Sequence, residues 1–500
     1  MRLIFLAMSI LCGASGLSQF CFQHIRRGRF NLFIGNLATR HRYVQSSPSG
    51  LHGGDQVDSL FRNLGIIPEL VKGLSEQGWV DPTPVQKAVV PRLLSGESLV
   101  IAAPTGSGKT VSFVLPVVQK LAIQETQGYV RQIRRPRCLI LVPTRDLARQ
   151  VLVVVKCLSH YSKISSCAVL GGEQYGLQKR KLDRLVDIVV ASPGRLVQHK
   201  EQGNLFLSQV DTVIIDEVDT MLMQGFGPDI RSIVKIVVGH NRRGKAVEMS
   251  DLASSTGGGT VDRHRPVQFI MATATLTKAV KSLLTEINQG GFDMDYSDPA
   301  NKRTNNESEK SRTNEVNLKF VEVDGLHRSL PNVRHVVEEL KGRDKFFVLQ
   351  TILQRSGAAK ISRTLLFCNS VASVRAVQYH LAESGTPALS YHGELNSRER
   401  EQNLLSFRNG TSLFMVCTDI AARGLDIPEI DHVVLVDFPL NPIDYLHRVG
   451  RCGRADRKGL VTSLVTKGDK VLSDAVQAAI ATNRPLDSLS SDKRRNQRPK

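Results

Sequence analysis

Two common stabilising or anchoring features are missing from this sequence. Its eight cysteines are scattered without a C-x-x-C pair, which argues against a zinc site or a disulfide framework and favours reduced, mostly buried thiols. Long apolar runs are missing as well: LIFLAMSILCGA (residues 3–14) is too short to span a bilayer, and nothing later is long and apolar enough. With 41% hydrophobic and 23% charged residues, the 500-residue chain is typical of a globular protein of two or three domains without a membrane span.

Acidic residues are absent from residues 1–54, which contain six arginines and no lysine. This composition is typical of an organelle transit peptide, although Arg2 followed by an apolar run also resembles a secretory signal or one half of a bipartite signal. We expect an organelle address in preference to a plain disordered terminus, and a chloroplast in preference to a mitochondrion. The segment supplies only +6 of the formal net charge of +19, so residues 55–500 are basic themselves, which suggests an anionic partner such as nucleic acid.

Apolar segments alternate with helical stretches in two series. The expected strands are 98–104, 137–143, 166–171, 186–193, 212–217 and 267–274, then 363–369, 387–393, 411–419, 431–439 and 459–466. Near-continuous apolar runs are typical of parallel strands that are covered on both faces. The two series predict an α/β fold of two tandem domains, each a parallel sheet with helices on both faces.

The polar stretches suggest where these domains begin and end. We expect the first domain over residues 55–330 and the second over 331–480, with a linker near 330–342 and a basic tail at 481–500. The stretches 241–265 and 293–317 are polar and cannot bury a core, so they are predicted to be flexible insertions in the first domain. The tail either improves solubility only or adds affinity for phosphate.

The segment APTGSGKT (103–110) directly follows an expected strand. Its small residues allow the backbone N–H groups to curl inward and bind phosphate at the start of a helix. Lys109 can reach the β- and γ-phosphates, and the Thr110 hydroxyl can bind Mg²⁺. Ala103 stands where the generic motif has glycine, and a chance glycine-rich turn is the alternative. The residues predicted to bind nucleotide are Ala103, Pro104, Thr105, Gly106, Ser107, Gly108, Lys109 and Thr110.

Three carboxylates stand at the end of the expected strand 212–217. A solvated acidic turn would explain them, but a P-loop site also needs a carboxylate at a second strand end to hold Mg²⁺. Asp216 suits that position, and Glu217 is placed to orient or deprotonate the attacking water. Asp219 is expected to hold neighbouring loops. The sequence therefore predicts a hydrolysis site.

Ten short motifs, in order, resemble those of the DEAD-box RNA helicases of superfamily 2, with DEVD in place of DEAD. They are Phe61 with PTPVQ (82–86), APTGSGKT (103–110), PTRDLA (143–148), GG (171–172), SPGR (192–195), DEVD (216–219), TAT (273–275), LLFCN (365–369), TDIAARGLD (418–426) and HRVGRCGR (447–454). The resemblance covers roughly residues 58–470. The departures, such as Asp146 for Glu and Thr273 for Ser, keep charge or hydroxyl, so they bear on rate and coupling and not on the ATPase chemistry.

This resemblance implies RecA-like domains and an ATP-dependent RNA helicase that uses ATP and Mg²⁺. It implies that Gln86 reads adenine with Phe61 stacked on the ring, and that Asp426 binds the ribose. It also implies that Arg451 and Arg454 approach the γ-phosphate from the second domain; a basic turn that contacts RNA or solvent is the other interpretation of HRVGRCGR. The residues implied to couple the domains are Asp219, Thr273, Thr275 and His447.

Contacts with RNA are expected where Gly, Pro, hydroxyl and arginine residues follow apolar strands, since such residues suit phosphate and sugar groups. The candidates are Thr144, Arg145, Gly172, Ser192 and Arg195 in the first domain and His392, Gly393 and Thr418 in the second. Aromatic residues make up only 5% of the chain, so stacking platforms are not expected. Binding should have weak sequence specificity and should fall as salt rises.

The leading hypothesis is an RNA-stimulated ATPase that separates short duplexes or remodels ribonucleoproteins when its two domains close. An ATP-gated RNA clamp with slow hydrolysis and a DNA translocase are the alternatives. We expect a monomer that acts on RNA without a membrane. An organelle helicase could assist ribosome assembly, intron splicing or RNA decay, and the frequency of such roles in the family favours a ribosomal RNA precursor.

Overall fold

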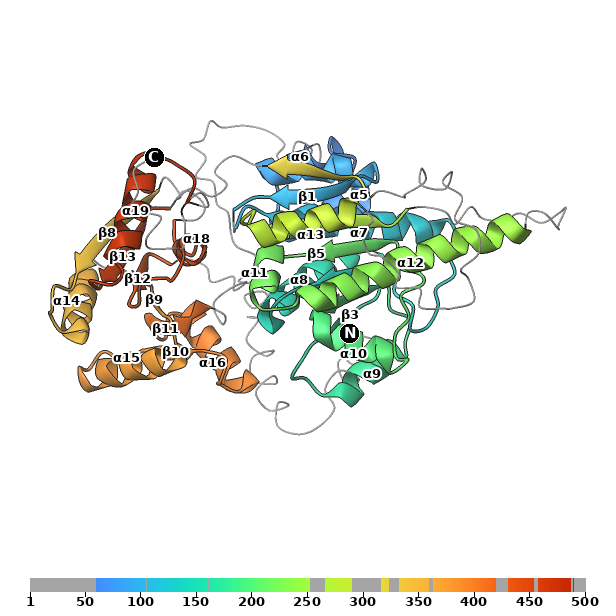
Figure 1. The fold of residues 1–500 in the computed structure, drawn as a ribbon. Coiled ribbons are helices and arrows are strands. Elements are labelled where there is room, and N and C mark those ends of the chain that lie inside the picture. Colours follow the sequence, from blue (N-terminus) through green and yellow to red (C-terminus); the bar gives the residue numbers. More distant parts are fainter. Residues whose placement is uncertain are drawn as a thin grey trace, which may run out of the picture.

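The computed structural model describes residues 60–104, 106–160, 162–251, 266–289, 316–322, 332–358, 363–419, 430–453, 457–486 and 489. The predicted transit segment lies outside these residues, as do Thr105, Asp426 and Arg454. The described residues form two α/β domains, each with its own parallel sheet (Figure 1). This arrangement confirms the predicted fold class.

The first domain is built on a seven-stranded sheet whose neighbouring strands all pair in parallel. In the order in which they lie side by side, the strands are β3 (Ser166–Val169), β4 (Ile188–Ala191), β2 (Cys138–Leu141), β5 (Thr212–Ile215), β6 (Gln268–Thr273), β1 (Ser98–Ala102) and β7 (Leu318–Glu322). The apolar runs predict six of them. They miss β7, because this edge strand buries only Leu318 and Val321.

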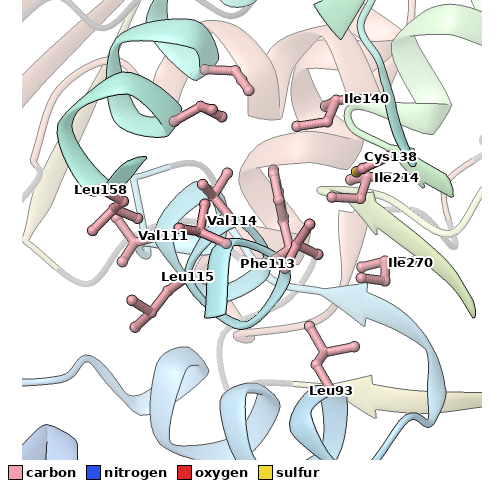
Figure 2. Packing of buried hydrophobic residues seen from close by; sticks show 14 of the residues in the cluster. Leu93, Val111, Phe113, Val114, Leu115, Cys138, Ile140, Leu158, Ile214 and Ile270 are labelled. Carbon is pink, nitrogen blue, oxygen red and sulfur yellow. The ribbon is translucent and has the colours of Figure 1, made fainter. Parts of the chain in front are cut away.

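Helices cover both faces of this sheet. They are α5 (Pro68–Glu76), α6 (Pro84–Leu94), α7 (Lys109–Thr126), α8 (Arg145–Ser159), α9 (Tyr175–Leu182), α10 (Pro193–Glu201), α11 (Val218–Met223), α12 (Gly227–Asp251) and α13 (Lys278–Asn288). Along each strand the side chains alternate between two hydrophobic clusters. Ile140, Ile214 and Ile270 pack with Phe113 of α7 on one face (Figure 2), and Val213 packs with α12 and α13 on the other.

The second domain has a six-stranded parallel sheet. Its strands lie in the order β10 (Leu389–Tyr391), β11 (Phe414–Thr418), β9 (Thr364–Cys368), β12 (His432–Leu435), β13 (Gly459–Val465) and β8 (Val333–Glu339). Its helices are α14 (Lys345–Ala358), α15 (Val371–Glu383), α16 (Ser397–Arg408), α18 (Pro442–Val449) and α19 (Lys470–Ala481). Two hydrophobic clusters pack on this sheet, one of them around α18 and α19 and the other around α14 and α15.

Three segments differ from the predicted boundaries. The expected linker near 330–342 contains β8, which pairs along its whole length with β13; it was missed because most of its residues are polar and only partly buried. The expected insertion 241–265 begins as helix, because α12 continues to Asp251. The expected tail 481–500 begins with chain that packs on the second domain, since Leu486 is buried in its core.

The described residues bear on two expectations, the lack of a membrane-spanning helix and the burial of the cysteines. Within them, no helix is both long and apolar enough to cross a membrane. The six cysteines found there are all free, and five of them are buried. Within the described part of the chain, this burial agrees with the expectation of mostly buried thiols.

The parallel sheets determine where the motifs meet. Because all strands of a sheet point the same way, the loops that follow them gather at one edge, where ligands of open α/β sheets bind. In the first domain the segments after β1, β6 and β5 carry the predicted ATP and coupling residues. The segments after β2, β4 and β3 carry the predicted RNA residues. The strand order thus divides one edge into two adjoining sites.

Candidate active site

The phosphate-binding segment joins β1 to α7. Gly106 and Gly108 have φ angles of 81° and 93°, which glycine tolerates best. The Lys109 ammonium donates hydrogen bonds to the carbonyl oxygens of Ala103 (2.6 Å) and Pro104 (2.9 Å), so it lies over the loop. The loop therefore presents a cation at the N-terminus of an 18-residue helix, where phosphate is favoured.

Ala103 and Ser107 have different roles in this loop. Ala103 is buried in the core of the first domain, and its N–H donates to the Thr273 carbonyl (3.2 Å), so its methyl group serves packing. The Ser107 hydroxyl is buried and has no hydrogen-bond partner within the described part of the chain. A buried polar group of this kind is expected to have a partner, and a phosphate oxygen would supply one.

Gln86 connects the start of α6 to the phosphate-binding loop. It forms a capping box with Thr83, whose N–H donates to Gln86 Oε1 (3.0 Å). Its Nε2 donates to the Gly108 carbonyl (3.3 Å), so the amide retains one N–H and one lone pair for further bonds. Adenine recognition by Gln86 stays a prediction. The remaining N–H and lone pair of its amide are the donor and the acceptor that such recognition would use.

Phe61 does not lie where the stacking prediction needs it. Its ring is only 1% exposed and packs in the hydrophobic core of the first domain with Ile66 and Leu70. A ring enclosed by aliphatic side chains offers no open face to a base. In this structure the residue supports the domain from within, and the predicted stacking contact is not met.

The acidic strand end after β5 has unusual backbone and electrostatic properties. Glu217 has φ 51° and ψ 51°, a left-handed conformation that is strained for a residue with a side chain. Its N–H donates to Asp216 Oδ1 (2.9 Å). Burial, together with the nearby Glu217 charge, raises the pKa of Asp216 to about 7 against the opposing effect of Lys109. A bound cation at this position would relieve that unfavourable environment.

The four predicted coupling residues form one connected group. The Thr275 hydroxyl donates to Asp219 Oδ2 (2.6 Å), and the Thr273 hydroxyl donates to the Thr275 carbonyl (2.7 Å). His447 Nε2, from α18 of the second domain, lies 3.5 Å from the same Asp219 oxygen. Burial alone would raise the pKa of Asp219, but His447 and the Thr275 hydroxyl hold it well below its usual range. The group thus joins the two domains beside the acidic strand end.

Arg451 lies just after the end of α18, about one helical turn beyond His447. It is buried, and its Nε donates to the His447 carbonyl (3.3 Å). It therefore lies on the part of the second domain that contacts α11, the helix that Figure 1 shows on the side of the first domain nearest the second. Its approach to a γ-phosphate stays a prediction.

Arg448 is a residue whose role sequence reasoning missed. It is only 1% exposed, and its guanidinium donates to both carboxylate oxygens of Asp419 (2.6 Å each) and to the Asp437 carbonyl (2.6 Å). It also contacts Asn369, so it ties together the ends of β11, β12 and β9. Its place in HRVGRCGR and the acid next to Thr418 were the available signals. For this arginine a solvated basic turn is the wrong interpretation.

The candidate RNA residues of the first domain are linked to one another. The Ser192 hydroxyl accepts from the Gly171 N–H (3.1 Å), and Arg195 donates to the Glu173 carbonyl (3.2 Å). The Thr144 hydroxyl caps α8 by accepting from the Leu147 N–H (3.2 Å). The loops after β3 and β4 are therefore tied together, and α8, which follows β2, meets them where Arg149 lies 3.7 Å from Glu173.

The absence of a side chain at Gly172 leaves space for the Arg145 guanidinium on this surface. It has φ 72°, and a Cβ on it would lie 1.9 Å from Arg145 Nη2. We expect Gly172→Ala to displace the guanidinium and remove about one phosphate contact, so the slope of log affinity for single-stranded RNA against log salt should flatten by roughly 0.7. Gly203→Ala is the matched control, because Gly203 has φ 68° and open space around its Cβ. Equal slopes for the two variants would contradict the role of Arg145.

The second domain places its three candidates at two strand ends. His392 follows β10 and is buried, and its Nδ1 has no hydrogen-bond partner among the described residues. Gly393 has open space where a Cβ would lie. Thr418 ends β11 next to Asp419, the partner of Arg448. β10 and β11 are neighbours, so these residues lie at adjacent strand ends.

Comparisons with known proteins agree with this arrangement. The DEAD/DEAH box helicase family model matches residues 83–283, and the model of the helicase conserved C-terminal domain matches residues 344–456. The DEAD-box ATP-dependent RNA helicase 39 of Arabidopsis thaliana is 35% identical over 483 residues, which cover 93% of this chain and 70% of that protein.

Two solved structures share the fold. Mss116p, bound to single-stranded RNA and AMP-PNP, has a TM-score of 0.68 at 22% identity, covering 85% of this chain and 77% of that one. S. cerevisiae Dbp5, bound to RNA and ADP BeF3, has a TM-score of 0.63 at 23% identity, covering 84% of this chain and 93% of that one. At these identities the likeness establishes the two RecA-like domains.

Fold and site together define a two-domain, nucleotide-hydrolysing enzyme of the helicase class. The chain belongs to the DEAD-box family of ATP-dependent RNA helicases, and as a member it is an ATP hydrolase that acts on RNA.

Proposed function

We propose that this helicase couples ATP hydrolysis to local separation of short RNA duplexes or to remodelling of ribonucleoproteins. The contact of Asp219 with both Thr275 and His447 carries the proposal. It places the second domain directly against the acidic strand end of the first. Closure of the domains and completion of the hydrolysis site are then the same event.

The site fits a magnesium ion that the nucleotide helps to hold. Among the described residues no three His, Cys, Asp or Glu side chains are grouped to bind a metal by themselves. Mg²⁺ prefers one or two protein oxygens together with water and phosphate oxygens. Asp216 and the Thr110 hydroxyl supply oxygens of this kind, and a bound ion there would neutralise charge on the phosphates.

The residues of the chain then have separate tasks in hydrolysis. Lys109 and the N–H groups of the loop hold the phosphates and offset their charge. Glu217 Oε2 is buried without a hydrogen-bond partner in the described part of the chain, so it can orient the attacking water and accept its proton. Arg451 and Arg454 are proposed to stabilise the γ-phosphoryl group from the second domain, and Asp426 to bind the ribose.

RNA is proposed to lie across the ends of β2, β3 and β4 and of β10 and β11. The candidates of the first domain offer backbone, hydroxyl and guanidinium groups, which suit phosphate and sugar contacts with weak sequence specificity. If closure joins both halves of this surface, RNA must tighten ATP binding by the same factor by which ATP tightens RNA binding. The protein is proposed to do this as a monomer.

A strand-displacement assay tests the proposal. A short RNA duplex with a labelled strand should separate on addition of ATP and not of a non-hydrolysable analogue. RNA-stimulated hydrolysis without displacement would favour an ATP-gated clamp, since both activities use the same site. Equal stimulation by single-stranded DNA would favour a DNA translocase. If RNA did not stimulate ATP hydrolysis, both the helicase and the RNA clamp hypotheses would be contradicted.

The site of action is proposed from the N-terminal composition. An arginine-rich, acid-free segment at residues 1–54 supports an organelle, with a plastid favoured. Ribosomal RNA precursors are proposed as the substrate because such roles are frequent in the family. A fluorescent fusion of residues 1–60 should enter plastids. Fluorescence in mitochondria, or spread evenly through the cytosol, would contradict the plastid assignment.

A further inference from the structure

A second contact joins the two domains, away from the acidic strand end. The Tyr391 hydroxyl donates a hydrogen bond to Asp146 Oδ2 (2.7 Å). Tyr391 is the last residue of β10 in the second domain and is 0% exposed, whereas Asp146 lies in the first turn of α8 in the first domain. The other carboxylate oxygen of Asp146 lies 3.6 Å from the Arg149 guanidinium. A partly buried hydrogen bond to an ionised acceptor is stronger than one between neutral groups.

We propose that Tyr391 and Asp146 are positioning residues that bring the two halves of the RNA surface together; this inference rests on the proposed function. Each residue adjoins candidate RNA residues. Thr144 and Arg145 directly precede Asp146, and His392 and Gly393 directly follow Tyr391. The hydrogen bond therefore sets the distance between the candidate RNA residues of the first domain and those of the second.

Charge at the same place explains why such a bond is needed. Arg145 of the first domain lies near Arg400 of α16 in the second, and burial, followed by the Arg400 charge, lowers the pKa of Arg145. The Glu173 and Asp146 carboxylates offset part of the repulsion between the two guanidinium groups, and an RNA phosphate would offset more of it. The Tyr391–Asp146 bond supplies attraction beside this repulsion without occupying the place of a phosphate.

The bond also belongs to the closed arrangement alone. When the domains separate, the Tyr391 hydroxyl and the Asp146 carboxylate each return to water, so the bond stabilises the closed state selectively. Burial and the Asp146 charge hold the pKa of Tyr391 well above its usual range, so the hydroxyl remains a donor at neutral pH. Removing this hydroxyl should change closure and leave each domain intact.

The test measures binding of a labelled single-stranded RNA by the full-length protein, with and without a non-hydrolysable ATP analogue. The ratio of the two affinities is the coupling factor. Tyr391→Phe should lower this factor about tenfold, the size expected from one hydrogen bond to a charged group, and should change RNA affinity without nucleotide by less than about twofold. Affinity for the analogue in the presence of RNA should fall by the same factor.

Two further variants separate positioning from a general structural effect. Tyr379→Phe is the matched control, because Tyr379 is 67% exposed on α15 and bonds to Glu383 of the same helix; its coupling factor should equal that of the unmodified protein. In an Asp146→Ala background, Tyr391→Phe should have no further effect. A thermal melt confirms that each variant is folded.

An unchanged coupling factor in Tyr391→Phe, or a full tenfold loss that persists in the Asp146→Ala background, would overturn the inference. Equal losses with and without the analogue would also overturn it, because they would indicate a local RNA contact. An unmodified protein with a coupling factor of one would contradict the proposed function as well. A normal factor in the unmodified protein and in Tyr391→Phe contradicts this inference alone.

Discussion

Glu217→Gln should lower RNA-stimulated ATP turnover by roughly 10²- to 10⁴-fold, the range expected when a general base is removed. The amide has the size and shape of the carboxylate but cannot accept a proton from water. Glu217 follows a buried strand in a strained left-handed conformation, and an observed outlier of this kind is typical of a functional position. Affinity for ATP and for RNA should change little, because Lys109 and the loop backbone, and not Glu217, are proposed to hold the phosphates.

Steady-state hydrolysis with saturating RNA measures this effect, and fluorescence titration with a labelled ATP analogue measures binding. Glu286→Gln is the matched control, since Glu286 of α13 pairs with Arg231 of α12 and adjoins neither predicted site. It should hydrolyse ATP at the unmodified rate. If Glu217→Gln kept more than about a tenth of the turnover, the proposed role of this carboxylate would be wrong.

Local chemistry explains why so much of the site could be predicted from the sequence. Glycines before Lys109 and carboxylates after an apolar strand indicate their function through residue type and spacing alone, with no knowledge of distant contacts. The same apolar runs indicate the strand ends, and a parallel sheet brings those ends to one edge. For this reason the sequence places Asp216 and Glu217 at the edge of the sheet that carries the phosphate-binding loop, and their roles in hydrolysis stay predictions.

Contacts between distant segments could not be predicted in this way. The bond from Tyr391 to Asp146 joins residues 245 positions apart, and no short pattern indicates it. Arg448 has the composition of a solvated turn but is enclosed by the ends of three strands. Phe61 was assigned from the family pattern, yet the packing around α6 and α7 buries its ring. In each case the tertiary surroundings, and not the residue type, decide the outcome.

Edge strands show the same limit in the fold. β8 and β7 lie at the margins of their sheets, so neighbours cover them on one side only. An edge strand can keep polar residues, as β8 (Val333–Glu339) does, and its sequence then resembles that of a linker. The extension of α12 to Asp251 also lies in a polar stretch, which the apolar pattern does not indicate as helix.

The strand order suggests how the two halves of the first domain communicate. β5, which ends in the acidic segment, lies between β2 and β6. The segment after β2 begins α8 with Thr144, Arg145 and Asp146, and the segment after β6 carries Thr273 and Thr275. The Asp219 group and the Tyr391–Asp146 bond are therefore interdomain contacts on either side of one strand end.

Arg451→Ala should lower RNA-stimulated turnover by roughly 10³-fold or more, the effect of removing an arginine that stabilises a transferring phosphoryl group. The residue follows His447 by one turn, and His447 lies 3.5 Å from Asp219, so closure brings this part of α18 to the acidic strand end. Arg451→Lys should recover only part of the loss, because an ammonium lacks the planar fork that spreads charge. ATP affinity in the absence of RNA should be nearly unchanged, since the first domain holds the nucleotide by itself.

Single-turnover hydrolysis with saturating RNA separates this chemical effect from slow product release. Arg343→Ala is the matched control, because Arg343 is about half exposed beyond β8 and bonds only to nearby groups at the end of that strand. If Arg451→Ala hydrolysed ATP within about tenfold of the unmodified rate, the second domain would not complete the hydrolysis site. Domain closure would then serve RNA binding alone, and the Asp219–His447 contact would report on closure without contributing to catalysis.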